Sequence, residues 1–134
     1  MLSVQPSIDA GLARIAPQFR ALSMLVEAAP LVHPQVGEAA LTRACAEVMA
    51  GGPVWAQAHL DAWSEVFKRF GAKPKRTPCS ADALRKRVLR DGVMAAIDPV
   101  VDLYNAISLR YAIPVGGENL AAYAGAPRLV IAEG

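Results

Sequence analysis

The chain has 134 residues, enough for a single domain with one hydrophobic core. Its apolar fraction of 54% excludes an intrinsically disordered protein, and no apolar run is long enough to span a membrane. The net charge is only +2, but nine of the fourteen Lys and Arg residues lie between Lys68 and Arg90, where Asp82 is the single acidic residue. This cationic span indicates an anionic partner, with nucleic acid as the first candidate.

The N-terminal region gives weak structural signals. It lacks the basic start and apolar middle of a signal peptide, so we expect a cytoplasmic protein. Residues 1–5 read as a short strand or a loose end, and residues 6–9 as a turn. The composition of residues 19–29, FRALSMLVEAA, slightly favours a helix. Alternating apolar residues fit a buried strand equally well: Leu22, Met24 and Val26.

Residues 36–50 show the periodicity of an amphipathic helix, which Gly51 and Gly52 end. Cys45 falls beside the apolar stripe, where we expect a buried thiol. Cys45 and Cys79 form no C-x-x-C pair, so we expect neither a disulfide nor a metal site. His33 and His59 have no second ligand at metal-binding spacing, and His59 is expected at the surface. No cofactor is predicted.

Residues 56–70 predict a second helix, with Gly71 at its C-terminal cap. One face carries four large apolar side chains: Leu60, Trp63, Phe67 and Phe70. The aromatic rings are able to stack on nucleic-acid bases, but their spacing is more typical of a hydrophobic core.

A proline-stiffened basic loop, residues 72–79, leads into a third helix over residues 80–91. Ser80 is expected to cap this helix and Gly92 to follow its end. Only a narrow apolar edge is available for packing, so the helix presents a cationic face. The loop and the helix supply the predicted RNA-binding residues: Lys73, Lys75, Arg76, Arg85, Lys86, Arg87 and Arg90. The alternative is a solvated face without a partner. A helix-turn-helix motif is disfavoured, because its turn has about three or four residues and this loop about ten.

A fourth helix is predicted over residues 99–111, with Asp98 as N-cap and Pro99 in the first helical position. An apolar row is expected to be buried: Val100, Tyr104, Ile107 and Tyr111. A polar row runs beside it, and Pro114 and a Gly-Gly-Glu-Asn segment follow the helix. We expect these polar groups and bare backbone to bind substrate through Asp102, Asn105, Ser108, Gly116, Gly117, Glu118 and Asn119. The alternative is a helix whose polar edge is merely hydrated.

The last predicted element is a strand over residues 128–131, which needs a partner elsewhere in the chain.

Four segments taken together resemble a known family: FGAKPKRTP, ALRKRVL, DPVVDLYNAISLRYAIPVGGENL and RLVIAEG. The chain is similar to free-standing proteins built on the editing (B3/B4) domain of the phenylalanyl-tRNA synthetase beta subunit, most strongly over residues 67–131. The resemblance implies an α+β fold, with helices packed over a small mixed sheet system and a strand at residues 19–29. It also implies that residues 1–134 form a single editing-like domain, the N-terminal portion of a longer one and incomplete at its C-terminus.

The functional implications of this resemblance concern translation quality control. In the synthetase, the domain hydrolyses mischarged aminoacyl-tRNA with an oriented water and no protein nucleophile. Asp102, Asn105 and Pro114 match positions of its motif, whereas Gly116 stands where the synthetase has a histidine. Glu118 is not the counterpart of the synthetase's recognition glutamate.

Two functions follow from the residues and the resemblance. The first is a domain that binds tRNA or aminoacyl-tRNA, with a small amino-acid ligand also possible, and that has no membrane or metal partner. The alternative is a trans-acting hydrolase of mischarged aminoacyl-tRNA, in which the amides of Gly116 and Gly117 stabilise an oxyanion. No catalytic side chain is assigned.

Overall fold

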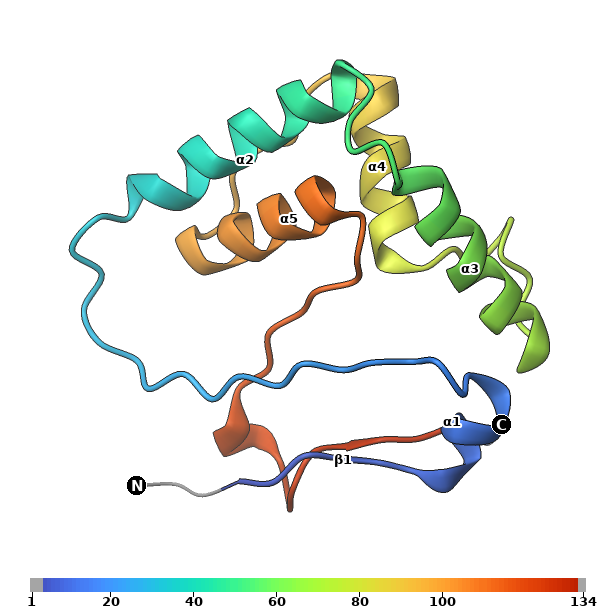
Figure 1. Ribbon diagram of the computed structural model, residues 1–134. Helices are drawn as coiled ribbons and strands as arrows, with labels where there is room; N and C mark the ends of the chain where they lie inside the picture. The colour runs from blue at the N-terminus through green and yellow to red at the C-terminus, as the bar shows by residue number, and fades with distance from the viewer. Residues whose placement is uncertain (1–3, 133–134) are drawn as a thin grey trace. The chain divides into compact units, whose positions relative to one another are not determined.

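The computed structural model describes residues 4–132 and confirms the α+β class (Figure 1). The chain divides into two compact units, one of Leu31–Gly117 and one of Met1–Pro30 with Glu118–Gly134. The larger unit contains α2 (Gln35–Met49), α3 (Ala56–Arg69), α4 (Ser80–Asp91) and α5 (Pro99–Tyr111). The smaller unit contains β1 (Ser7–Ile8), α1 (Ala10–Ile15), the 3-10 helix η1 (Leu120–Ala122) and β2 (Arg128–Leu129). None of the helices described is long and apolar enough to cross a membrane.

The four helices of the larger unit confirm the sequence prediction to within one residue at each end. Asp98 caps α5 by accepting hydrogen bonds from the backbone N–H groups of Val100 and Val101. Gly92 follows α4 in the left-handed conformation, with φ of 78°. The expected cap at Ser80 is wrong, because Cys79 is the extended N-cap residue and Ser80 is already helical. Cys79 is buried against Leu60 and Ala81, which places the start of the helix there.

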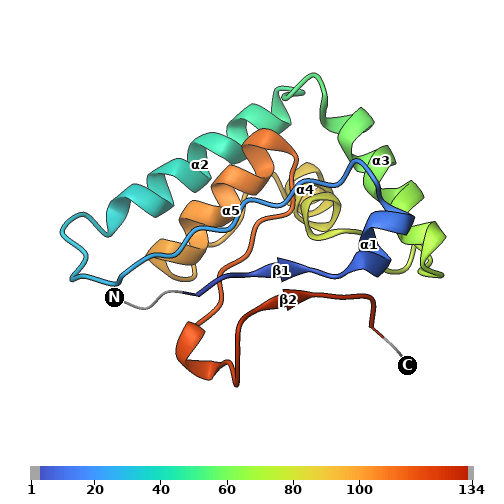
Figure 2. The ribbon, with the colours of Figure 1, turned by 60° about the horizontal axis from the view of Figure 1, so that its bottom comes forward.

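The core of the larger unit is built around α2 and α5, which lie side by side and run in the same direction (Figures 1 and 2). A Cβ atom built on Gly37 of α2 would overlap the carbonyl oxygen of Pro99, so the two helix N-termini approach through bare backbone. At the other end of the pair, Arg110 Nε lies 3.7 Å from Glu47 Oε2. Buried side chains from three helices fill the space along the pair: Leu41, Ala44, Cys45, Val48, Val88, Ala106 and Leu109.

The buried face of α5 differs from the sequence prediction. The expected apolar row is largely exposed, with Val100 at 55% and Tyr111 at 45%. The residues that face the core are instead mostly small or polar: Asp102, Ala106, Ser108 and Leu109. The small side chains of Ala106 and Ser108 suit the close approach of the two helices, and Leu109 fills the core near the end of α5.

A second apolar cluster joins α3 to the start of α4. Leu60, Cys79 and Ala81 are buried there, with Trp63 and Phe67 packed against them. The prediction of core aromatics is therefore confirmed for these two rings, whose centroids lie 6.3 Å apart in an edge-to-face arrangement. Phe70 lies farther out and is 40% exposed.

The smaller unit contains a parallel pairing of β1 and β2, in which Ser7 is opposite Arg128 and Ile8 opposite Leu129. The predicted turn at residues 6–9 is wrong because Ser7 and Ile8 are the strand partners that the C-terminal segment needs. Sequence analysis also missed α1. Asp9 is its N-cap residue, and the side chain of Asp9 accepts a hydrogen bond from the backbone N–H of Gly11.

Residues 19–29 form neither of the elements considered for them. The segment is exposed, with Leu22 at 86%. The strand that the resemblance implies is therefore wrong for these residues, which pair with neither β1 nor β2. Of the possible strand at residues 1–5, residues 1–3 lie outside the described residues, and residues 4–5 belong to no strand.

We predict that Gly37→Ala destabilises the protein by about 1–3 kcal/mol, because the added methyl group forces α2 and α5 apart. Gly→Ala within a helix ordinarily stabilises it by about 1 kcal/mol, so the sign of the change separates the two effects. Urea denaturation measures it. Gly116→Ala is the matched control, since a Cβ atom added there would meet no other described residue within 4 Å. A more stable Gly37→Ala protein would contradict the close helix contact.

Candidate functional site

The polar row of α5 begins at Asp102, which is only 3% exposed. Its Oδ1 accepts a hydrogen bond of 2.8 Å from the backbone N–H of Ile97. This bond ties the segment before α5 back onto the first turn of the helix. Asp102 therefore holds the backbone that leads into α5.

Ser108 has the same role at the other end of the helix. It is fully buried, and its Oγ donates a hydrogen bond of 2.6 Å to the carbonyl oxygen of Ile113. The N–H of Ile113 donates in return to the carbonyl oxygen of Ser108. Asp102 and Ser108 lie about 9 Å apart along the helix axis. The polar row of α5 therefore holds two different loops, one at each end of the helix, and does not form a single cluster.

The remaining predicted substrate-binding residues have different surroundings. Asn105 is half-buried, and its amide makes no hydrogen bond to another described residue. Gly116 is exposed and open, whereas a Cβ on Gly117 would lie 3.3 Å from the ring of Tyr104. Glu118 and Asn119 begin the second segment of the smaller unit, where Asn119 caps η1 by accepting from the N–H of Ala121.

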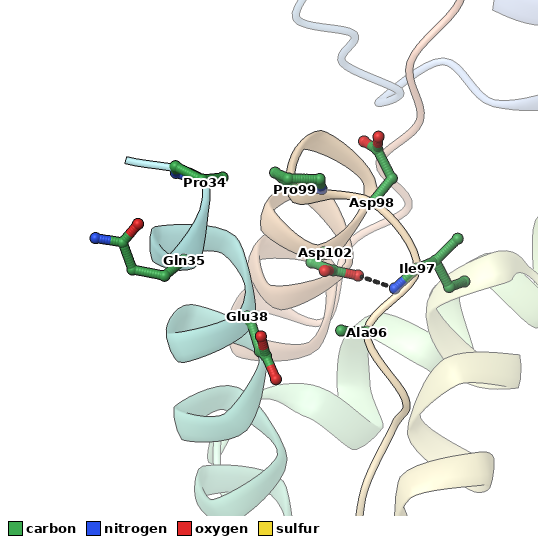
Figure 3. Close-up of a pocket in the computed structure, with 8 residues that line it drawn as sticks. All are labelled: Pro34, Gln35, Glu38, Ala96, Ile97, Asp98, Pro99 and Asp102. Atoms are coloured by element: carbon green, nitrogen blue, oxygen red, sulfur yellow. Dashed lines mark hydrogen bonds between the residues drawn. The ribbon is translucent and has the colours of Figure 1, made fainter. Parts of the chain in front are cut away.

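Asp102 also lines a cavity of about 340 Å³ between the N-termini of α2 and α5 (Figure 3). The carboxyl groups around it come from Glu38, Asp98 and Asp102. Because α2 and α5 are parallel, the positive ends of both helix dipoles meet here, and the carboxylates compensate them. No group of three His, Cys, Asp or Glu residues within the described residues is arranged to hold a metal ion.

Side chains from Trp55 and the first turn of α3 contact backbone carbonyl oxygens at the C-terminal end of α5. Sequence analysis missed this contact. Trp55 Nε1 donates a hydrogen bond of 2.9 Å to the carbonyl oxygen of Tyr111. The Nδ1 of His59 lies 3.4 Å from the carbonyl oxygen of Ala112, whose φ is 52°. His59 is exposed, as predicted. These partners lie more than 50 positions apart in the sequence, so no local pattern signals the contact.

All seven predicted RNA-binding residues lie on the α3–α4 loop or on α4. Lys73, Lys75 and Arg76 of the loop are exposed. On α4, Arg85 Nη1 donates a 2.7 Å hydrogen bond to the carbonyl oxygen of Gly52, between α2 and α3. Arg85 therefore braces the fold.

The other cations of α4 lie close to acidic residues. Lys86 pairs with Asp82 at 2.7 Å, and Arg90 pairs with Asp91. The hydrogen bond between Arg90 and Asp91 raises the pKa of the arginine and lowers that of the aspartate, to which Arg87 also contributes. Within the cationic span, the exposed loop cations are therefore more available to a ligand than Arg85, Lys86 and Arg90.

The two cysteines are free and buried. Burial raises the pKa of both the Cys45 and the Cys79 thiol, so each is protonated at neutral pH. A protonated, buried thiol is a poor nucleophile, and neither cysteine is suited to covalent catalysis.

In a comparison with protein-family models, residues 62–134 match the B3/4 domain. The match covers more than half of the chain and includes α4, α5 and part of α3. No curated protein and no solved structure shows a significant match.

We predict that alanine substitutions in the polar row of α5 differ in how much they destabilise the protein. Asp102→Ala and Ser108→Ala each remove the partner of a loop backbone group and should cost about 1–3 kcal/mol of stability. Asn105→Ala should change stability by no more than about 0.5 kcal/mol. Thermal unfolding of the three variants makes the comparison. Equal stability of all three would refute the bracing role of Asp102 and Ser108.

Proposed function

The chain belongs to the B3/4 domain family, the domain of the phenylalanyl-tRNA synthetase beta subunit, and from this premise we propose that it binds tRNA and inspects the attached aminoacyl group. The family supports a synthetase-associated domain. The binding of tRNA by this chain is our proposal.

The observation that carries the proposal is the concentration of positive charge. Nine of fourteen basic residues lie between Lys68 and Arg90, within the matched region and within the larger unit. Phosphate contacts dominate the affinity of proteins for nucleic acids, and clustered Lys and Arg side chains steer polyanions toward the surface. An RNA ligand accounts for a span in which Asp82 is the single acid.

Recognition of the aminoacyl group is assigned to Asn105 and to the backbone of Gly116 and Gly117. The Asn105 amide offers both a donor and an acceptor. The two glycines are exposed, so their backbone is open to close approach by a ligand. Asp102 and Ser108 act as positioning residues, because their hydrogen bonds hold the loops at the two ends of α5.

Hydrolysis of the aminoacyl ester is the second candidate. It rests on the same exposed glycine backbone, because ester hydrolysis needs donors for the developing oxyanion and an oriented water. Turnover of a mischarged tRNA by the purified protein would favour this candidate. Binding without turnover would leave the binding domain as the function.

We predict that unfractionated tRNA binds at low salt and that its affinity falls by about 30- to 10³-fold between about 50 and 200 mM salt, as expected for about three to six phosphate contacts. Fluorescence anisotropy with labelled tRNA measures the affinity at each salt concentration.

The control compares aminoacylated with deacylated tRNA. Tighter binding of the aminoacylated form supports inspection of the aminoacyl group, whereas equal binding would remove that part of the proposal. No binding at the lowest salt concentration would overturn the proposed function.

A further inference from the structure

The seven predicted RNA-binding cations differ in what their side chains contact: three of the four on α4 are engaged, whereas Arg87 and the three in the loop are not. On α4, Arg85 donates to Gly52, Lys86 pairs with Asp82, and Arg90 pairs with Asp91. In the loop before α4, the side chains of Lys73, Lys75 and Arg76 make no ion pair or hydrogen bond to another described residue. The loop thus carries three exposed cations within four residues.

The acidic residues nearest in sequence are already engaged. Glu65 pairs with Lys68 at 2.6 Å, and Asp82 pairs with Lys86. Neither of these two carboxylates pairs with a cation of the loop, so Lys73, Lys75 and Arg76 are available to an external polyanion. The N-terminus of α4 follows the loop and adds the positive end of its helix dipole.

The loop also has a defined backbone. The carbonyl oxygen of Lys73 accepts hydrogen bonds from the N–H groups of Arg76 and Thr77, at 2.9 and 2.8 Å. Pro74 lies within this turn and fixes its own φ. The N–H of Ala72 donates a hydrogen bond to the carbonyl oxygen of Phe67, and Cys79 is buried against Leu60. Both ends of the loop are therefore held against α3. Binding then orders only side chains, which lowers its entropic cost.

We propose that the turn formed by residues 73–76 is the principal phosphate-binding element for RNA, because three of the four cations of α4 are already engaged by a backbone carbonyl or a carboxylate. This inference rests on the proposed function, since it says which part of the cationic span holds the RNA backbone.

The test compares two variants that each remove three positive charges. K73Q/K75Q/R76Q changes the turn, and K86Q/R87Q/R90Q changes α4 while keeping Arg85. The probe is unfractionated tRNA, and the readout is the slope of log affinity against log salt concentration. Each phosphate contact contributes about −0.7 to −0.9 to this slope, so the turn variant should reduce it by about two to three and the helix variant by less than about one.

Each outcome of this test decides the inference. Equal reductions in slope would overturn it and leave the proposed function in place, whereas absence of binding by the unchanged protein would overturn both. Polyglutamate that binds as tightly as tRNA, with the same dependence on the turn, would replace RNA by an acidic protein as the partner. Circular dichroism verifies that each variant folds, and K73R/K75R, which keeps the charge, should retain the original slope.

Discussion

The contact on which the larger unit depends is the approach of α2 to α5 at Gly37. A side chain at this position would overlap the carbonyl oxygen of Pro99, so the backbone of one helix lies directly against that of the other. Several side chains along the shared face are small, although Leu109 of α5 is buried there as well. Ala44 and Ala106 lie in that core, and Ser108 is buried on α5. The residues of α5 on the predicted apolar row, such as Val100 and Tyr111, are more exposed.

Parallel packing at such short range has an electrostatic consequence. The positive ends of two helix dipoles lie together, and Glu38, Asp98 and Asp102 surround the cavity between them. The carboxylates therefore stabilise the helix pair. At the opposite end, the indole N–H of Trp55 satisfies a carbonyl oxygen of α5. Much of the polar chemistry of α5 thus maintains the fold, whereas the half-buried amide of Asn105 makes no hydrogen bond to another described residue.

The same distinction between engaged and available groups applies to the cationic span. Its high charge density agrees with the proposal that the domain binds RNA, but density alone does not identify the contacts. Arg85 illustrates the point: it lies in the most basic helix, yet its guanidinium braces the backbone at Gly52. The turn at residues 73–76 combines charge, exposure and an ordered backbone, and these are the properties that a phosphate contact requires.

Local signals in the sequence determined the helices of the larger unit. Asp98 and Pro99 begin α5, and Gly71 and Gly92 follow α3 and α4 with positive φ. The cationic span and the family were also evident, since charge and motif order are properties of the chain itself. These features could be predicted because caps, breakers and charge act over a few residues.

The tertiary structure alone decided which face of α5 is buried. Periodicity favoured the row that includes Val100 and Tyr111, but the face that packs against α2 carries Ala106, Ser108 and Leu109. Likewise, the partners of Trp55, Arg85 and Ser7 lie far away in sequence, and no local pattern encodes a contact between distant segments. Sequence periodicity shows that a helix has two faces, whereas the shape of its neighbour determines which of them is buried.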